Sequence, residues 1–206
     1  MAGLPDELRE AVLRLQPGQV VLVSGAGGAV GSMAGQFARL SGAGRVIGSA
    51  GGADKCQWLL DQCGFDHVIN YRDSDFAHEL GIAAPEGVDL FFDNVGGWQM
   101  AAAFRNMKLH GRVSMCGAIS NFGVVEQPTT SVMIELVLRR VTLQGFIVRD
   151  YEDLRPEFEA KVGGWLASGE LVDRATVFEG IENAAVGLAG LLAGANAGKA
   201  LVRLSD

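Results

Sequence analysis

Short apolar runs recur along the chain, and longer segments that mix polar and apolar residues separate them. The runs predict six strands, at residues 20–23, 45–49, 67–69, 88–93, 111–116 and 142–148. The segments between them predict helices that include residues 32–40, 76–80, 98–107, 133–140 and 154–168. Strands that alternate with helices form parallel sheets with right-handed crossovers. We therefore expect an α/β protein built on a doubly wound, six-stranded parallel sheet.

After residue 170 the pattern changes to a strand, a helix and a strand, predicted at residues 173–178, 181–192 and 200–204. We expect residues 1–170 to form one α/β domain and residues 171–206 to form a separate C-terminal segment. Strands without neighbours leave open edges and exposed apolar side chains, which here would include Val177, Phe178 and Leu201. Self-association would cover them.

The most informative motif is the glycine-rich turn that follows the first strand. Read as Gly25-x-x-Gly28-x-x-Gly31, it places glycines where a tight turn, a close approach to phosphate and helix packing need them. A count from Gly25 and Gly27 fails, because the last small position falls on Val30. A helix that starts here offers backbone N–H groups to a diphosphate. The alternative is a glycine-rich turn without a ligand.

The end of the second strand bears on which dinucleotide is bound. No acid stands there to accept hydrogen bonds from a ribose 2′-hydroxyl, as NAD sites usually require. Lys55 follows Gly51 and Gly52, and Tyr71 ends the next strand, so both can contact a 2′-phosphate. This pattern favours NADP(H). The alternative is that Lys55 is a solvated residue paired with Asp54 or Asp61.

Three further loops lie at carboxyl ends of strands, where open α/β sheets bind ligands. Asn94 and Ser120 carry polar groups suited to the nicotinamide ribose. Gly96, Gly97 and Gly117 would let the backbone approach a ring closely. Ordinary turn chemistry is the alternative explanation.

Composition narrows the classes of partner. The 206 residues carry a net charge of −7, which argues against nucleic acid or an anionic membrane surface. Three scattered cysteines and three histidines show no ligand spacing, so we expect neither a disulfide framework nor a metal site. No apolar run is long enough to span a bilayer, and the first residues do not resemble a signal peptide. We expect a soluble cytoplasmic protein.

Taken together and in order, these motifs resemble the zinc-independent medium-chain dehydrogenase/reductases. The similarity covers residues 17–203 and is greatest to the branch of prostaglandin reductases, alkenal double-bond reductases and curcumin reductases. The motifs that carry it are residues 25–32, 50–55, 93–97, 116–120, 144–148 and 194–199. The resemblance implies a Rossmann fold and NADPH-dependent reduction of the carbon–carbon double bond of an α,β-unsaturated aldehyde or ketone. Hydride would pass from the nicotinamide to the β-carbon, and a proton would reach the α-carbon.

The resemblance also implies a cofactor role for particular positions. The diphosphate would be held by Gly28, Ala29, Val30 and Gly31. The 2′-phosphate would contact Lys55 and Tyr71, and the ribose would contact Asn94. The nicotinamide end would lie against Cys116, Ala118, Ser120, Phe122, Phe146, Ile147 and Val148, and its carboxamide region near Asn196.

Two departures from the family pattern affect the expected activity. Phe122 stands where family members commonly have a tyrosine proposed to protonate or orient the substrate, so the catalytic residue is unknown. Only 16 residues precede residue 17, so we expect the N-terminal GroES-like catalytic domain of the family to be missing. The resemblance implies that residues 171–206 belong to this otherwise absent domain. We expect either a fragment or truncated product, or a stand-alone domain that self-associates. The sixth strand, at the sheet edge, favours a homodimer.

Three classes of function follow from these observations. The chain is an NADPH-dependent enone reductase or a remnant of one, a nucleotide-binding module without catalysis, or a structural protein that kept the fold and lost the ligand. The first predicts NADPH oxidation with an enal, the second predicts binding without turnover, and the third predicts no dinucleotide binding.

Overall fold

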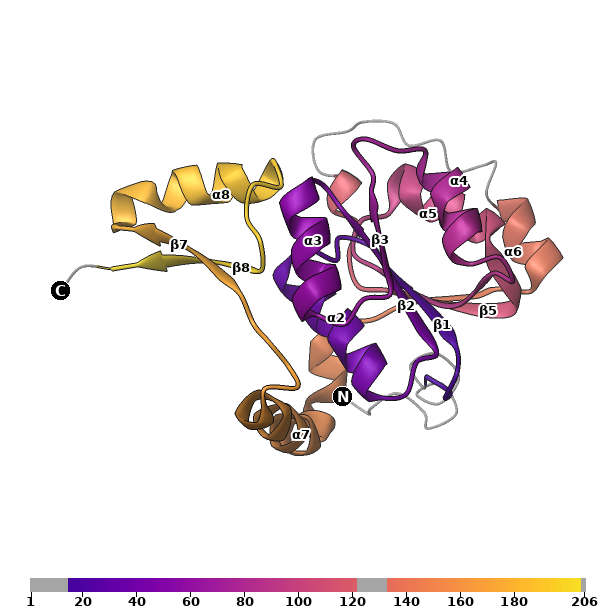
Figure 1. Ribbon diagram of the computed structural model, residues 1–206, viewed down its shortest axis with the longest axis horizontal. Helices are drawn as coiled ribbons and strands as arrows, with labels where there is room; N and C mark the ends of the chain where they lie inside the picture. Colours follow the sequence, from indigo (N-terminus) through magenta and orange to yellow (C-terminus); the bar gives the residue numbers. More distant parts are fainter. Residues whose placement is uncertain (1–14, 122–132, 205–206) are drawn as a thin grey trace.

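The computed structural model describes residues 15–121 and 133–204. Its main feature is a six-stranded parallel sheet in the order β3-β2-β1-β4-β5-β6 (Figure 1). The strands are β1 (Val20–Val23), β2 (Arg45–Ala50), β3 (His67–Asn70), β4 (Val88–Asp93), β5 (Met107–Met115) and β6 (Thr142–Gly145). The helical segments are α2 (Ala29–Leu40), α3 (Ala53–Gln62), α4 (Phe76–Ala83), α5 (Gly97–Arg105), η1 (Ile119–Asn121), α6 (Met133–Arg139), η3 (Val148–Leu154) and α7 (Arg155–Ser168). The predicted doubly wound α/β fold is confirmed.

Helices cover both faces of the sheet, and the strands supply side chains to both. Val21 and Val23 of β1 belong to the core beneath α2 and α3, whereas Leu22 belongs to the core beneath α4 and α5. Figure 1 shows α2 and α3 on one face and α4, α5 and α6 on the other. Double coverage explains why the strands were recognisable as nearly continuous apolar runs. It leaves the loops at the carboxyl ends of the strands free to form a site.

The sixth strand is shorter than predicted. It ends at Gly145, not at residue 148, and residues from Val148 onward form the 3-10 helix η3. Phe146 leaves the strand and packs its ring 6.0 Å from that of Phe92 and 6.1 Å from that of Tyr151. Aromatic packing therefore ends β6 three residues early and directs the chain over the carboxyl edge of the sheet.

Two other boundaries differ from the prediction. Helix α2 begins at Ala29 instead of residue 32, so the second half of the glycine motif forms its first turn. Strand β5 begins at Met107 instead of residue 111, which also shortens the preceding helix. The pairing of β5 with β4 shifts between Val88 and Leu90, and His110 has a φ of 61° within the irregular part. This irregularity hides the start of β5 from a strand pattern.

Beyond α7 the chain forms a small unit of β7 (Ala175–Glu179), η4 (Ile181–Asn183), α8 (Ala184–Leu192) and β8 (Lys199–Arg203), which projects from the α2–α3 side of the sheet (Figure 1). β7 and β8 pair in parallel. Phe178 packs against α8, since a Cβ on Gly187 would lie only 3.1 Å from its ring. Phe178 is therefore half-buried, whereas we expected it to be exposed. Val177 and Leu201 are 39% and 45% exposed, as expected. The assignment of this unit to an incomplete second domain stays a prediction.

The segment between α7 and β7 is fastened to α2 by one buried side chain. Gln36 is only 2% exposed. Its Nε2 donates to the carbonyl of Val172 at 2.9 Å, and its Oε1 accepts from the N–H of Val172 at 2.8 Å. The carboxamide thus pairs with the backbone as a neighbouring strand would. This contact anchors the projecting unit to the helix whose first turn carries the glycine motif.

The Gln36→Ala variant should lose about 2 kcal/mol of unfolding free energy, because it leaves both backbone groups of Val172 without their partner. Urea denaturation followed by circular dichroism measures this loss. Gln57→Ala is the matched control, because Gln57 is exposed and bonds only Asp61 on its own helix. The control should change stability by less than about 0.5 kcal/mol. Equal stability of the two variants would show that Gln36 does not fasten the linker.

Candidate functional site

Backbone conformation and close packing explain why the turn between β1 and α2 contains glycines. Gly25 has a φ of 59°, a left-handed conformation that disfavours other residues. A Cβ on Gly31 would lie 2.3 Å from the carbonyl oxygen of Gly25, which no side chain can satisfy. The N–H of Gly28 donates to Gly25 O at 3.1 Å and closes the turn. The backbone of the turn therefore packs directly on the start of α2.

The first turn of α2 has the features of a helix N-terminus that can bind an anion. The N–H groups of Ala29, Val30 and Gly31 precede any carbonyl that an α-helix could offer them. Gly28, at the N-cap, supplies no side-chain cap, and the first turn contains no acidic residue. Val30 is 53% exposed, so this helix end is open to solvent. The four predicted diphosphate positions thus surround one helix N-terminus.

Lys55 is half-buried at the start of α3, close to the glycine turn. Its Nζ donates to the carbonyl of Gly194 at 2.6 Å. Burial, and then the positive charge of Arg72, lower the pKa of the Lys55 ammonium. No ion pair of Lys55 with Asp54 or Asp61 occurs among the described residues, and Asp61 instead accepts from Gln57. The described residues therefore do not support the alternative that Lys55 is a solvated helix residue paired with an acid.

Tyr71 lies against Gly51, directly after the end of β2. A Cβ on Gly51 would lie 2.6 Å from Tyr71 Oη and 2.9 Å from Arg72 Nε, so both polar groups reach the α-carbon of Gly51. Arg72 was missed from the sequence, although its place directly after Tyr71 was a usable signal. Asn70 was also missed; its Oδ1 accepts from the N–H groups of Gly52, at 3.0 Å, and Arg72, at 3.3 Å. Asn70 thereby holds the two loops together.

Asn94 is held at the end of β4 by a buried network. Its Nδ2 donates to Ser24 O at 2.7 Å, and its N–H donates to Ser24 Oγ at 2.9 Å. Ser24 Oγ in turn donates to Asp93 Oδ1 at 2.6 Å. Asp93 is completely buried and also accepts from the N–H groups of Val95 and Gly96. The network fixes the Asn94 amide between the ends of β1 and β4.

The loops after β4 and β5 are joined to each other. Ser120 Oγ donates to Val95 O at 2.6 Å, and the N–H of Ser120 donates to the same carbonyl at 3.0 Å. A Cβ on Gly117 would lie 3.2 Å from Asn94 O, which shows how closely the two loops pack. The proton of the Ser120 hydroxyl is therefore used in the hydrogen bond to Val95 O. Toward a ribose, this hydroxyl would act as an acceptor of a hydrogen bond. Its predicted contact with the cofactor stays a prediction.

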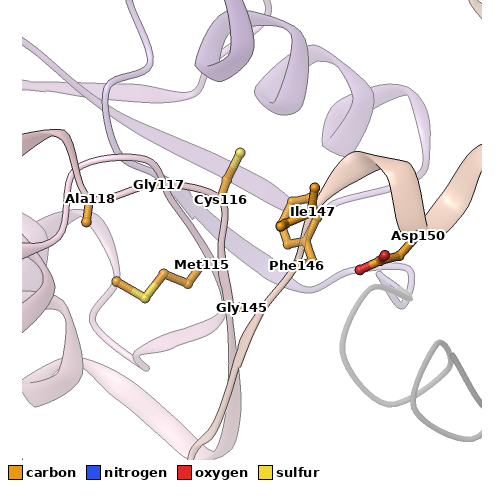
Figure 2. Close-up of a pocket in the computed structure, with 8 residues that line it drawn as sticks. All are labelled: Met115, Cys116, Gly117, Ala118, Gly145, Phe146, Ile147 and Asp150. Atoms are coloured by element: carbon orange, nitrogen blue, oxygen red, sulfur yellow. The ribbon is translucent and has the colours of Figure 1, made fainter.

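An open hollow of about 460 Å³ lies at the carboxyl ends of β5 and β6 (Figure 2). Four of the residues predicted for the nicotinamide end line it, namely Cys116, Ala118, Phe146 and Ile147. The remaining lining residues are Met115, Gly117, Gly145 and Asp150. Burial, and then the charge of Asp93, raise the pKa of the Cys116 thiol, which keeps it neutral. The floor of the hollow is largely apolar.

The hollow is not lined by three other described positions that were predicted for the nicotinamide end, Ser120, Val148 and Asn196. Val148 begins η3 and is 69% exposed. Asn196 is buried, and its Nδ2 donates to Gly198 O at 2.8 Å. Because the N–H of Gly198 donates to Gly27 O at 2.9 Å, Asn196 lies beside the glycine turn. Phe122 lies outside the described residues.

Asp150 was not foreseen as a lining residue. The prediction that β6 runs to residue 148 placed this carboxylate beyond the sheet, whereas η3 turns it back toward the hollow (Figure 2). Its N–H donates to Ile147 O at 3.0 Å, which closes the turn. The only signal in the sequence was an acid close to the end of a predicted strand.

Two kinds of feature are absent from the described part of the chain. No group of three or more histidine, cysteine, aspartate or glutamate residues there is arranged to hold a metal ion. In the same residues, no helix combines the length and the apolar character needed to cross a membrane.

A parallel α/β sheet, a glycine turn on a helix N-terminus and polar loops at the strand ends define a nucleotide-binding domain of the dehydrogenase class. The family profile described as "Zinc-binding dehydrogenase" matches residues 29–163, and the chain belongs to this family. Its relatives lie in the alkenal and curcumin reductase branch, which confirms the resemblance derived from the motifs.

Three relatives illustrate the similarity. The chain is 36% identical over 189 residues to (+)-pulegone reductase of Mentha piperita, and 38% identical over 189 residues to 2-alkenal reductase (NADP(+)-dependent) of Nicotiana tabacum. Both alignments cover 91% of this chain and 55% of the relative, so the chain spans about half the length of these curated relatives. The solved CurA of Vibrio vulnificus in complex with NADPH is 38% identical, with a TM-score of 0.88, and the match covers 93% of this chain and 58% of CurA.

Proposed function

We propose that this chain is the NADP(H)-binding part of a reductase that reduces the carbon–carbon double bond of α,β-unsaturated aldehydes or ketones. One observation carries the proposal. The end of β2 lacks an acid; instead, Tyr71 lies beside Gly51, and Lys55 lies beside Gly27 in the turn that leads to the open N-terminus of α2. A dinucleotide with a 2′-phosphate matches both features. The relatives named as NADP-dependent and the NADPH complex of CurA support the same assignment.

The residues present fit this cofactor along its length. The N–H groups at the start of α2 would bind the diphosphate, since they point out of a helix end that carries partial positive charge. Lys55 and Tyr71 would bind the 2′-phosphate, and the Asn94 carboxamide, whose Nδ2 is bonded to Ser24 O, would accept from a ribose hydroxyl through Oδ1.

The hollow at β5 and β6 would receive the nicotinamide. When bound, the cofactor supplies the hydride. The chain itself would orient the ring against Ala118 and Phe146, and its apolar floor would exclude water. Burial, and then the charge of Asp93, raise the pKa of the Cys116 thiol and make it a weak acid, and Ser120 Oγ donates to Val95 O, so neither group is suited to deliver a proton to the substrate. We propose that another group is the proton donor.

A second candidate function is a nucleotide-binding module without catalysis. The openness of the hollow favours it, because nothing in the described residues covers the nicotinamide position from the solvent side. The chain also spans only 55–58% of its relatives. Binding of NADPH without turnover of a 2-alkenal would select this function.

Titration with NADPH and NADH, followed by nicotinamide fluorescence, tests the binding assignment. Lys55→Ala should weaken NADPH binding about tenfold, because a charged hydrogen bond is lost, and should change NADH binding less than about twofold. Lys161→Ala is the matched control, because Lys161 is exposed on α7 and pairs with Glu157. It should leave both affinities unchanged.

Two outcomes would contradict the assignment. Equal binding of NADPH and NADH by the unmodified chain would remove the 2′-phosphate from the proposal. Binding of neither would remove the cofactor and, with it, the reductase function of this chain. If NADPH binds, oxidation of NADPH in the presence of a 2-alkenal then separates the reductase from the non-catalytic module.

We also propose that the chain forms a homodimer through β6, which pairs only with β5 in the six-stranded sheet. Strand β6 and the preceding helix α6 expose apolar side chains, among them Val137 at 69%, Leu138 at 58% and Leu143 at 38%. Light scattering that gives the monomer mass at all concentrations would exclude this dimer. The expected cytoplasmic location stays a prediction.

A further inference from the structure

Arg72 has no role in the assignments above, yet its surroundings are unusual. It immediately follows Tyr71 in the loop after β3, and it is exposed. One terminal nitrogen donates to the carbonyl of Ala193 at 3.0 Å. Lys55 binds the next carbonyl, that of Gly194, at 2.6 Å. Two cations, one on helix α3 and one in the loop after β3, therefore bind adjacent carbonyls of the segment that follows α8.

The two cations lie close enough to influence each other, and no acid separates them. The charge of Arg72 lowers the pKa of Lys55. Among the described residues, neither cation forms an ion pair. Asp73, which follows Arg72, accepts from Asn70 instead, and Asp54, which precedes Lys55, forms no ion pair within the described residues. Like charges held together without a counter-charge are unfavourable, and an anion between them removes that cost.

Arg72 is exposed, so an anion can reach its guanidinium from solvent. Arg72 Nε and Tyr71 Oη both pack over Gly51, at 2.9 and 2.6 Å from the position of a Cβ, which places the two polar groups side by side. The guanidinium has five N–H donors in a planar fork, and its bond to Ala193 uses only one.

We propose that Arg72 is a specificity-determining residue that binds the 2′-phosphate of the cofactor together with Lys55 and Tyr71. The inference rests on the proposed function and assigns to one further side chain a share in the choice between NADPH and NADH. The carbonyl of Ala193 holds the guanidinium in place, so the segment after α8 takes part in this choice. A 2′-phosphate carries a charge between about −1.5 and −2 near pH 7, which suits two cations.

The test compares Arg72→Gln with the unmodified chain by isothermal titration. The probes are NADPH, NADH, 2′,5′-ADP and 5′-ADP, of which the last two report on the phosphate without the nicotinamide. Arg72→Gln should weaken NADPH and 2′,5′-ADP about fivefold to tenfold, and NADH and 5′-ADP less than about twofold. Arg72→Lys keeps the charge and should restore most of the preference.

Arg105→Gln is the matched control, because Arg105 is exposed at the end of α5 and its loss changes the net charge equally. It should leave all four affinities unchanged. A merely structural role of Arg72, through Ala193, would weaken NADPH and NADH alike and would overturn the inference. So would equal behaviour of Arg72→Gln and Arg105→Gln. If the unmodified chain does not prefer NADPH or 2′,5′-ADP, the proposed function itself fails.

Discussion

Gly31→Ala should destabilise the protein by about 3 kcal/mol and weaken NADPH binding about a hundredfold or more. The added Cβ would lie 2.3 Å from Gly25 O and 2.8 Å from the α-carbon of Ala26, and both are backbone atoms of a tight turn. The turn and the first turn of α2 must separate. The N–H groups that would bind the diphosphate move with them, so stability and binding fail together.

Chemical denaturation and NADPH titration measure the two effects. Gly164→Ala is the control, because Gly164 lies within α7 and nothing stands within 4 Å of its added Cβ. It should stabilise the protein by about 0.5–1 kcal/mol, as alanine does in an exposed helix, and should leave binding unchanged. If Gly31→Ala bound NADPH as tightly as the unmodified chain, the α2 N-terminus would not be the diphosphate site.

Asp93→Ala should cost about 4 kcal/mol of unfolding free energy. The carboxylate is completely buried and accepts from Ser24 Oγ and from the N–H groups of Val95 and Gly96. Removal leaves three buried donors without an acceptor. Asp93→Asn keeps one acceptor oxygen and should cost about half as much. Denaturant unfolding gives both values.

Asp54→Ala is the control for a lost carboxylate, since Asp54 is exposed in the first turn of α3. It should change stability by less than about 0.5 kcal/mol. The same Asp93→Ala preparation should bind NADPH more weakly, because Ser24 loses its partner and no longer fixes Asn94. A stable Asp93→Ala protein would show that the network does not organise the ends of β1 and β4.

The sequence predicted much of this architecture because local patterns carry it. Strands buried on both faces must be apolar throughout, which made β1, β2 and β4 readable as runs. The glycine motif of the first turn could be recognised in the sequence because the fold requires it. Gly31 packs against the backbone of Gly25, and only glycine allows that approach. The wrong ends of β5 and β6 come from His110 in a left-handed conformation and from Phe146 packing on rings, neither of which a pattern encodes.

The sequence by itself determined the fold class, the glycine turn at the start of α2 and the absence of an acid at the end of β2. Each depends on residues that are neighbours along the chain. Only the tertiary structure decided which groups meet across it: Lys55 and Gly194 are 139 positions apart, Arg72 and Ala193 are 121, and Gln36 and Val172 are 136. Such contacts depend on how the segment after α7 returns to the sheet. The short-range pattern of apolar and polar residues does not determine that path. Only the folded chain therefore shows that Arg72 lies near Lys55 at the predicted phosphate site.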